Sequence, residues 1–358
     1  MTPKRREKLH SQLLGWYARC GRDLPWRRTH DPYAIWISEV MLQQTQVNTV
    51  KPYYRRFLER FPTVEALAAA PLDAVLKAWE GLGYYGRARR AHDAAQRIVS
   101  EHGGQVPQRV ELLLALPGVG RYTAGAIASM AFGLDEPVLD GNVARVLCRL
   151  FRVRQPPWQT ATQKQLWQRA RQLIPPGQAG LFNQALMELG ASVCVAKRPR
   201  CGTCPLIELC CARAHNEQDE LPLKPQRKTL PHHAVAVGVV WKDEQFLLCQ
   251  RDHEGLLGGL WELPGGRPKP GETCEECVLR KVQDRLAVRV DVRHRVASVK
   301  HAFTHFRITL HAYECLYVAG EPQALGCAAW RWVGREDVSQ YALPKATHNV
   351  LHVLGLRV

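Results

Sequence analysis

The apolar pattern of this chain changes once along its length, and that change constrains the fold more than any other feature. Up to about residue 213, apolar residues recur at the spacing of helices. Beyond residue 231, stretches such as 233–241 and 307–318 are rich in valine and aromatic residues, as strands are. Because 358 residues are enough for two domains that each bury a core, we predict an all-α domain followed by an α+β domain.

A polar segment broken by prolines separates the two patterns at 214–231, and this composition is typical of an interdomain connector. We therefore place the helical domain at 1–213 and the second domain at 232–358. Helix start signals recur in the first domain, for example Asp31 before Pro32, an N-cap carboxylate ahead of a proline at the first helical position. The helices that we expect span 5–19, 32–43, 46–60, 64–69, 72–80, 87–101, 109–115, 121–132, 142–150, 160–174 and 181–191 in the first domain, and 274–287 and 344–354 in the second.

The net charge of +16 is concentrated in the first part of the chain, where residues 1–228 hold 33 Lys and Arg against 19 Asp and Glu. Such an excess suits a polyanionic partner, because each phosphate that is neutralised releases condensed counterions. A basic but inert surface is the alternative. The N-terminus lacks the apolar core of a secretory signal, and no apolar run reaches the roughly 18 residues of a membrane span. We expect a cytoplasmic, nucleoid-associated protein without a membrane segment.

Residues 116–120 read LPGVG, and this short segment separates two expected helices. Gly118 and Gly120, on either side of Val119, allow a tight turn and give a ligand unhindered access to backbone N–H groups. The helix that follows adds the positive end of its dipole, so the segment is suited to hold a DNA phosphate without reading a base. A glycine-containing turn between two helices is also a common structural connection, and the segment alone does not decide between the two.

Two carboxyl groups, Glu39 and Asp140, are candidates for acid and charge chemistry. Glu39 lies within an apolar helix, and a carboxyl among apolar neighbours tends to have a raised pKa, as a general acid near neutral pH requires. Asp140 follows Val138 and Leu139 at the start of a helix, where it can be a simple N-cap. The helix dipole at that position favours the ionised form, so capping and catalysis are compatible.

Four cysteines within seventeen residues predict a metal site, because the chain has no secretory signal that would favour disulfides. Zinc and iron–sulfur clusters both accept four thiolates, and the spacing does not choose between them. A second pair, Cys274 and Cys277, has no partner pair nearby, and we interpret it as incidental. The four candidate ligands follow the pattern C-x6-C-x2-C-x5-C and are Cys194, Cys201, Cys204 and Cys210.

Four further segments precede this cysteine pattern in a fixed order. They are SEVMLQQTQV (38–47), GLGYYGRARR (81–90), LPGVGRYTAGAI (116–127) and VLDGNVARV (138–146). Together with the cysteines, over about the first 210 residues, they resemble the endonuclease III superfamily of helix-hairpin-helix DNA glycosylases, and within it the adenine glycosylases. The resemblance implies that the four cysteines bind one [4Fe-4S] cluster and that the chain acts on duplex DNA.

The resemblance also assigns roles to residues in these segments. Glu39 would protonate adenine at N7, and Asp140 would stabilise an oxocarbenium-like sugar or bond to it transiently. Tyr122 stands where bifunctional members of the superfamily have a lysine that forms a Schiff base, so strand cleavage by that route is excluded. Asn142 and Tyr122 would orient the reacting groups; without that role they are a polar residue of a first helical turn and a packing aromatic.

Base chemistry in a duplex requires that the target nucleotide leave the stack. The resemblance therefore implies a set of residues that contact the duplex or the extruded base. These are Gln44 and Tyr84, which would enter the stack beside the opposing base, Trp26 and Arg27, which would line the adenine pocket, and Gly118, Val119 and Gly120 of the turn.

The second domain resembles a Nudix fold through GLLGGLWELPGG (255–266) and the following Glu272. Glu272 and Arg280 lie in register with the Nudix box, whose glutamates bind magnesium at a pyrophosphate. The positions after the arginine where further glutamates would stand hold Lys281, Asp284 and Arg285. We therefore do not expect pyrophosphate hydrolysis.

Without that metal site, the second domain is predicted to bind rather than to hydrolyse. It resembles the 8-oxoguanine recognition domain of the adenine glycosylases, whose Phe-Ser-His motif corresponds here to Phe303, Thr304 and His305. Thr304 retains a hydroxyl that could bond the damaged base and adds a methyl group. These residues could also be ordinary strand residues.

These features predict a monofunctional adenine DNA glycosylase of base excision repair, acting as a monomer on duplex DNA with adenine opposite 8-oxoguanine or guanine. A bifunctional glycosylase and AP lyase of the endonuclease III type is one alternative, opposed by Tyr122 and by the second domain. A non-catalytic iron–sulfur protein that binds DNA is another, opposed by the presence of both Glu39 and Asp140.

Overall fold

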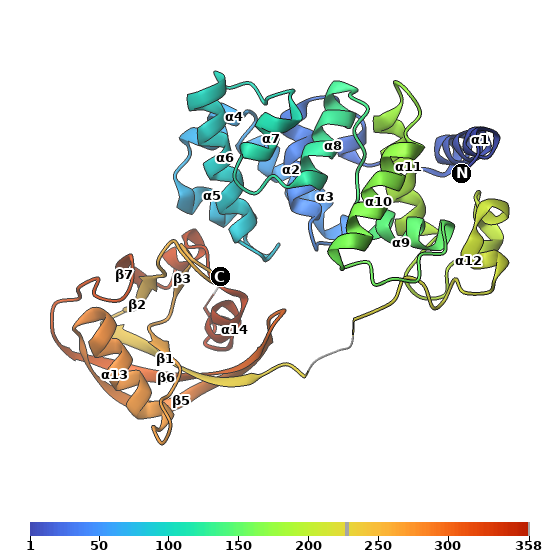
Figure 1. Cartoon of the computed structure of the whole chain (residues 1–358). Helices are drawn as coiled ribbons and strands as arrows, with labels where there is room; N and C mark the ends of the chain where they lie inside the picture. Colours follow the sequence, from blue (N-terminus) through green and yellow to red (C-terminus); the bar gives the residue numbers. More distant parts are fainter. Residues whose placement is uncertain (226–228, 357–358) are drawn as a thin grey trace. The chain divides into compact units, whose positions relative to one another are not determined.

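The computed structural model describes residues 1–225 and 229–356 (Figure 1). Its contacts divide the chain into two compact units, the first comprising the described residues of 1–68 and 93–227 and the second those of 69–92 and 228–358. Residues 226–228 of the predicted connector and 357–358 of the predicted second domain lie outside the described part. Each unit is considered by itself below.

The predicted helical part is all-α, which confirms that half of the expected fold class. Asp31 caps its helix by accepting the N–H groups of Tyr33 and Ala34, and Asp140 caps another by accepting that of Val143. The expected boundaries agree with the observed ones to within two residues, and in the helices that Asp31 and Asp140 cap, the side-chain caps mark the first residue of the helix. The helices are α1 (Pro3–Cys20), η1 (Pro25–Arg27), α2 (Pro32–Leu42), α3 (Val47–Arg60), α4 (Val64–Ala69), α5 (Leu72–Trp79), α6 (Gly86–His102), α7 (Val110–Ala115), α8 (Arg121–Phe132), α9 (Gly141–Leu150), α10 (Thr160–Leu173), α11 (Ala179–Ser192), η2 (Cys201–Thr203), η3 (Ile207–Leu209) and α12 (Cys211–Ala214).

Helices from distant parts of the sequence pack together in the first unit and position the candidate carboxyls. α2 packs against α8, and α11 packs against α8, α9 and α1. Small residues allow the closest approaches: a Cβ on Gly190 of α11 would lie 2.7 Å from Cβ of Asn142. The start of α9, which carries Asp140 as its N-cap, is thereby held against the last turn of α11.

The turn between α7 and α8 has the conformation that its glycines suggest. Gly118 has φ of +75°, a left-handed value that favours glycine. Gly120 is the N-cap residue of α8, and a Cβ added to it would meet no atom within 4 Å. The predicted helix-hairpin-helix arrangement is therefore present, with open space in front of Gly120.

The second unit is built on a mixed sheet of seven strands, which confirms the α+β prediction. Its main order is β3-β2-β1-β6-β5, with β4 paired to β1 and β7 paired to β2. β1 and β6 are parallel, and the other pairs are antiparallel. The strands are β1 (His232–Lys242), β2 (Gln245–Gln250), β3 (Trp261–Glu262), β4 (Gly265–Gly266), β5 (Arg289–Ala302), β6 (Arg307–Ala319) and β7 (Ala329–Gly334).

Two helices cover opposite faces of this sheet. α14 (Lys345–Val353) packs with Val237 and Val239 of β1, whereas α13 (Cys274–Leu286) packs with Ala236 and Val240. The alternation along β1 places successive side chains in two separate cores. Among the residues that the structure describes, no helix combines the length and the apolar character needed to cross a membrane.

Residues 69–92 group with the second unit through specific polar contacts. Gln250 donates to Asp73 at 2.8 Å, and Lys77 donates to the carbonyl of Tyr341 at 3.0 Å. The N–H of Leu343 donates to Glu80 at 2.8 Å. α5 and the segment that follows it therefore belong to this unit by contact, although the sequence pattern assigned them to the helical domain.

Candidate active site

Glu39 is a buried carboxyl, only 3% exposed, on the face of α2 that packs against α8. Burial raises its pKa to about 7; the Tyr122 hydrogen bond and the charge of Arg27 act against this shift, and Asp140 adds to it. A carboxyl with a pKa near neutrality can hold a proton and release it to a substrate at physiological pH. The predicted rise in the pKa of Glu39 is therefore present, and its role as a general acid stays a prediction.

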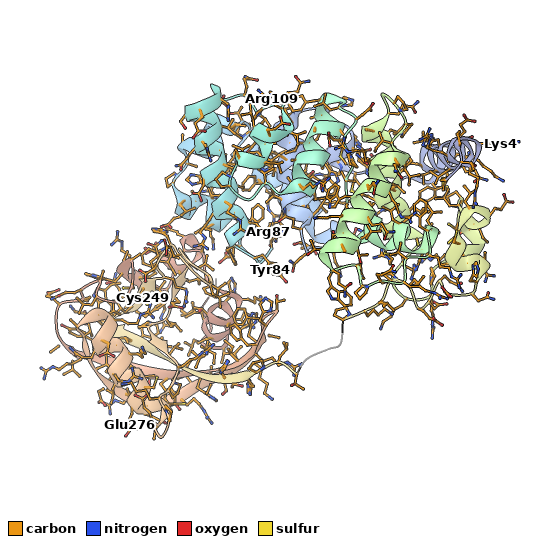
Figure 2. The ribbon with its side chains drawn as sticks, in the orientation of Figure 1. Lys4, Tyr84, Arg87, Arg109, Cys249 and Glu276 are labelled. Carbon is orange, nitrogen blue, oxygen red and sulfur yellow. The ribbon has the colours of Figure 1, made fainter. Side chains whose placement is uncertain are left out.

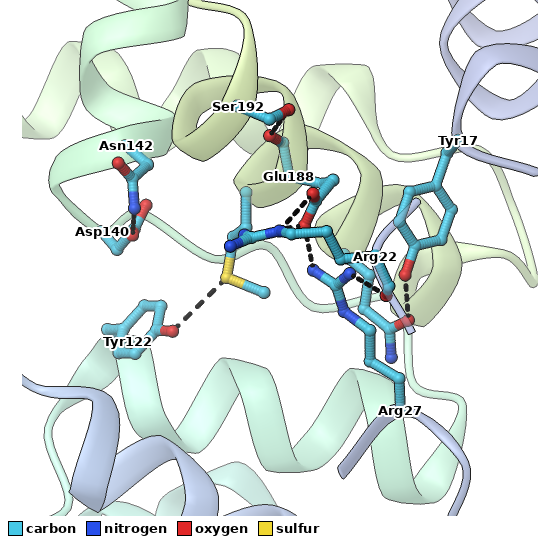
Figure 3. A network of polar contacts seen from close by, with 10 residues as sticks. Tyr17, Arg22, Arg27, Tyr122, Asp140, Asn142, Glu188 and Ser192 are labelled. Carbon is cyan, nitrogen blue, oxygen red and sulfur yellow. Dashed lines mark hydrogen bonds and ion pairs between the residues drawn. The ribbon is translucent and has the colours of Figure 1, made fainter. Parts of the chain in front are cut away.

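Tyr122 lies at the start of α8 and donates its hydroxyl hydrogen to Oε2 of Glu39. The hydroxyl oxygen of Tyr122 also lies 3.4 Å from Sδ of Met187 on α11 (Figure 3). Burial, followed by the charges of Glu39 and Asp140, raises the pKa of Tyr122 well above its ordinary value. The residue therefore stays a neutral hydrogen-bond donor and does not act as a nucleophile.

Asp140 accepts two hydrogen bonds, from the N–H of Val143 at 2.7 Å and from Nδ2 of Asn142 at 2.8 Å. Burial raises the pKa of Asp140, and these two donors, with the charge of Arg145, limit the rise. Capping and orientation by Asn142 are thus combined in one carboxylate, as expected. The pKa of Asp140 is raised overall, so burial has a larger effect than the helix terminus. The sequence alone did not indicate this balance.

A chain of contacts joins Asp140 to the cysteine segment. Arg145 donates to Oδ1 of Asn142 at 2.8 Å, to the carbonyl of Gly190 at 2.7 Å and to the carbonyl of Cys194 at 2.8 Å. Asn142 in turn binds Asp140 through the other end of its amide. One arginine therefore fixes the position of the predicted catalytic aspartate relative to the first cysteine of the pattern.

The predicted pocket residues Trp26 and Arg27 lie in η1, which is one turn long. Trp26 is buried and packs edge-to-face on Tyr54, with ring centroids 5.4 Å apart. Arg27 extends over the ring of Tyr17 at 5.3 Å and donates to Glu188 at 2.7 Å. η1 packs against α2, the helix that carries Glu39, and the charge of Arg27 acts to lower the pKa of Glu39.

The sequence did not single out Glu188, which the structure places at the centre of a polar network. It is completely buried on α11 and binds Arg22 and Arg27 (Figure 3). Beside it, Tyr17 donates to Gln184 at 2.9 Å. A lone carboxylate in the otherwise apolar segment ALMELGA (185–191) was the available signal, because buried charges require partners.

The four candidate ligand cysteines surround one cavity of about 30 Å³, which confirms that the cysteine pattern converges. Arg149 is buried beside it and donates to Sγ of Cys194 at 3.3 Å and to the carbonyl of Val195 at 2.7 Å. Four thiols and an arginine aimed at one of them form a donor set for a thiolate-bound metal centre. The residues therefore fit a metal cluster.

The two residues predicted to enter the base stack share an unusual backbone conformation. Gln44 has φ of +57° and Tyr84 has φ of +49°, left-handed values that side chains other than glycine adopt rarely. Both are exposed, Tyr84 by 47%. Arg87 lies 5.5 Å from the centre of the Tyr84 ring (Figure 2). Left-handed, exposed positions of this kind are common where a chain presents a side chain to a ligand.

The residues predicted to contact a phosphate, in the turn that follows α7, differ in the backbone N–H groups that they leave available. The N–H of Val119 donates to the carbonyl of Leu116 at 3.2 Å, and its side chain is buried. Gly120 opens α8, whose first N–H groups have no partner within the helix. The backbone after Gly118 is therefore positioned to bind an anion, mainly through the end of α8.

Thr304 and His305 lie at the tip of the hairpin between β5 and β6, not within a strand. The N–H of Phe303 donates to the carbonyl of Phe306 at 2.8 Å and closes the turn. Phe303 packs into the hydrophobic core beneath, whereas Thr304 and His305 are exposed. Within the same unit, the hydroxyl of Thr304 lies 3.0 Å from that of Tyr84. The structure thus brings together two residues predicted separately for DNA contact.

The Nudix-like positions are occupied by ion pairs. Glu272 forms a bidentate pair with Arg280 at 2.6 and 2.7 Å, and the hydrogen bonds from Arg280 lower the pKa of Glu272 to about 2. Arg285 binds Glu262 at 3.0 Å, and Asp284 lies 3.5 Å from Arg280. Carboxylates that would bind magnesium are here absent or already paired with arginine, which supports the expectation that this unit does not hydrolyse pyrophosphates.

Three family models match this chain. One described as HhH-GPD superfamily base excision DNA repair protein matches residues 37–172. One described as the iron-sulfur binding domain of endonuclease III matches 194–210, and a NUDIX domain model matches 236–353. The second match identifies the four-cysteine segment as an iron–sulfur binding domain and resolves the choice between zinc and iron–sulfur that the spacing left open.

Curated relatives extend the similarity over nearly the whole chain. The adenine DNA glycosylase of Homo sapiens is 38% identical, with 95% of this chain and 73% of the human protein covered. That of Rattus norvegicus is 37% identical over 95% of this chain and 77% of the rat protein. A thermostable thymine-DNA glycosylase of known structure is 32% identical with a TM-score of 0.55, covering 59% of this chain and 98% of its own.

Proposed function

This chain belongs to the adenine DNA glycosylase family, and we propose that it hydrolyses the N-glycosidic bond of adenine opposite 8-oxoguanine or guanine in duplex DNA. The observation that carries the proposal is the buried Glu39, which accepts a hydrogen bond from the half-buried Tyr122, with the half-buried Asp140 close enough for its charge to act on both. An acid with a pKa of about 7 and a carboxylate close enough to influence it are the two groups that loss of a neutral base requires.

In the proposed reaction, Glu39 transfers its proton to N7 of adenine, so that the base departs as a neutral molecule. The C1′–N9 bond breaks and its electron pair leaves with the base. Asp140 faces the positive charge that develops on the sugar, held in orientation by Asn142. Asp140 either stabilises the cation until water arrives or bonds to C1′ transiently and is then displaced by the water. The water bonds to C1′ and gives one proton to the carboxylate of Glu39, which restores the acid.

The reaction stops at an abasic site, because no amine stands next to the sugar. Tyr122 occupies the position at which the bifunctional enzymes have a lysine, and a neutral phenol cannot form an imine. The hydrogen bond from Tyr122 to Glu39 gives this residue a different role, that of orienting the acid. The chemistry is therefore monofunctional.

One [4Fe-4S] cluster is the cofactor that we propose for Cys194, Cys201, Cys204 and Cys210. Cubane clusters take four cysteine thiolates, as this set provides. Among residues 1–225 and 229–356, no three His, Cys, Asp or Glu side chains are arranged to hold a single metal ion, whereas the four thiols surround a common cavity. The cluster would act structurally, because base excision transfers no electrons.

We propose that the turn between α7 and α8 binds the phosphates of duplex DNA. Gln44 and Tyr84 would enter the base stack opposite the extruded adenine. The left-handed backbone and the exposure of both residues support this assignment. Thr304 and His305, at the exposed hairpin tip, would read the opposing base. A helical domain at 1–213, a connector at 214–231 and a recognition domain at 232–358 remain our proposed functional division, in a monomer that acts on the nucleoid.

Single-turnover excision from synthetic duplexes tests the proposal. Adenine should be released from duplexes that place it opposite 8-oxoguanine or guanine, and more slowly from one that places it opposite thymine. Strand scission should appear only after alkali is added to open the abasic site. Absence of adenine release from all three duplexes, with folded protein that binds them, would refute the proposed activity.

A further inference from the structure

Glu188 is a completely buried carboxylate that two arginines share. Oε1 accepts from Nε of Arg22 at 2.6 Å, and Oε2 accepts from Arg22 at 3.0 Å and from Arg27 at 2.7 Å. On its own element, the backbone carbonyl of Glu188 accepts from Ser192 at 2.8 Å. Burial acts to raise the pKa of Glu188, but the hydrogen bonds from Arg22 and Arg27 outweigh it and keep the pKa below its ordinary value. The carboxylate is therefore ionised.

Arg27 depends on this carboxylate for its orientation. Its guanidinium lies over the ring of Tyr17 at 5.3 Å, donates to Glu188 through Nη2 and donates to the carbonyl of Arg22 through Nη1 at 2.9 Å. Only 12% of the Arg27 side chain is exposed. A planar group held from three directions has one available orientation, and Figure 3 shows Glu188 as the contact common to both arginines.

We propose that Glu188 is a positioning residue for base excision: it fixes the Arg27 guanidinium in η1, which packs against the helix that carries Glu39, and it offsets part of the positive charge of Arg22 and Arg27 there. The inference deepens the proposed function and rests on Glu39 being the proton donor. Glu188 itself touches neither Glu39 nor, in this assignment, the departing base. It acts through Arg27.

The groups that shift the pKa of Glu39 come from several elements. Tyr122 of α8 and Arg27 of η1 act to lower its pKa, and Asp140 at the start of α9 acts to raise it. With Glu188 present, Arg22, Arg27 and Glu188 together carry one positive charge. Without the carboxylate they would carry two in a partly buried site, where charges are screened weakly.

This difference has a defined sign. A more positive surrounding favours the ionised form of Glu39 and lowers its pKa. Excision requires the protonated form and therefore falls as pH rises through that pKa. Loss of the Glu188 charge should move the alkaline fall of the excision rate to lower pH, whereas a merely structural Glu188 would change the rate and leave the position of the fall unaltered.

The test uses the full-length holoprotein with Glu188→Gln, which keeps the shape of the side chain and removes its charge. Single-turnover excision from duplexes with adenine opposite 8-oxoguanine would be measured between pH 5.5 and 9, about the range in which such an acid titrates. Because the glutamine oxygen can still accept a hydrogen bond from Arg27, we expect the guanidinium to stay in place, the maximal rate to fall by at most about tenfold, and the alkaline limb to move down by about one pH unit. Glu136→Gln, which breaks the exposed ion pair with Arg171, is the matched control and should change neither.

Two further variants keep the inference testable if Glu188→Gln does not fold. Glu188→Asp retains the charge and should leave the alkaline limb in place while the rate falls. Arg27→Gln removes the cation whose charge lowers the pKa of Glu39 and should move the limb in the opposite direction, to higher pH. If neither Glu188→Gln nor Arg27→Gln displaces the limb, although the unaltered enzyme releases adenine, the role of Glu188 is refuted and the proposed activity stands. If the unaltered enzyme releases no adenine, the activity itself fails.

Discussion

Tyr122 donates its hydroxyl hydrogen to Oε2 of Glu39, so that the first turn of α8 holds the carboxyl contributed by α2. This bond favours the ionised carboxylate, yet the pKa of Glu39 lies at about 7 because burial has the larger effect. Burial and the hydrogen bond from Tyr122 therefore shift the pKa of Glu39 in opposite directions. Each can be removed separately.

Tyr122→Phe should raise the pKa of Glu39 further, because it removes a donor that stabilises the charged form. The alkaline limb of the excision rate should move to higher pH, while the maximal rate falls about tenfold through loss of orientation. Single-turnover rates over a pH series measure both effects. A limb that moves to lower pH would contradict the assigned direction of the hydrogen bond.

Glu39→Gln should abolish adenine release while duplex binding persists, because only the proton donor is lost. The same change should stabilise the fold at alkaline pH. Raising the pKa of Glu39 from 4.5 to about 7 means that stability is lost as pH rises through this window, by up to about 3 kcal/mol. Urea unfolding at pH 8 should show the variant to be the more stable protein, and at pH 4 the difference should vanish. Equal stability at both pH values would contradict the burial of the carboxyl as the cause.

Gly190→Ala should separate α11 from α9, since the added Cβ would lie 2.7 Å from Cβ and 2.9 Å from the carbonyl oxygen of Asn142. We expect the free energy of unfolding to fall by about 1–3 kcal/mol and excision to slow, because Asn142 orients Asp140. Gly15→Ala, in α1, meets only an arginine side chain at 3.5 Å and serves as the control. Chemical denaturation and excision assays on both variants would distinguish crowding from a general effect of alanine.

Borohydride should trap little covalent enzyme on DNA, because no imine can form at Tyr122. Tyr122→Lys places an amine at that position, and an amine, unlike a phenol, can form an imine with the sugar. Trapped complex, seen as a shifted band on a denaturing gel, should therefore appear with this variant. Abundant trapping with the unaltered enzyme would point to another amine and to a lyase.

Thr304→Val should reduce discrimination between 8-oxoguanine and guanine opposite adenine, because it removes the hydroxyl and keeps the size of the side chain. The rate of excision from each duplex should change by a smaller factor than the ratio of the two rates does. Thr304→Ser retains the hydroxyl and should preserve the ratio. An unchanged ratio in the valine variant would reassign the hairpin tip to a structural role.

Much of the helical part could be predicted from sequence because its signals are local. The caps at Asp31 and Asp140 and the glycines around 118–120 determine where helices begin and end without reference to distant residues. Glu39 was identifiable for the same reason, as a carboxyl among apolar neighbours in one helix. These features depend on residues only a few positions apart.

The remaining features depend on packing between distant segments. The role of Glu188 arises from arginines 166 and 161 positions away, and no local pattern joins them. Phe303, Thr304 and His305 were compatible with a strand, and only the hydrogen bond that closes the turn places them at a tip. The grouping of α5 with the sheet likewise follows from contacts such as Lys77 with Tyr341.

The hydroxyl contact between Thr304 and Tyr84 has a consequence for selectivity. In the free protein each of these groups already has a partner, so an incoming base gains only the difference between the new bond and the one it displaces. If Thr304 reads the opposing base as proposed, a base that bonds weakly to it would leave the pair intact, and one that bonds strongly would release the Tyr84 hydroxyl. Recognition of the opposing base by Thr304 and release of Tyr84 would then occur together.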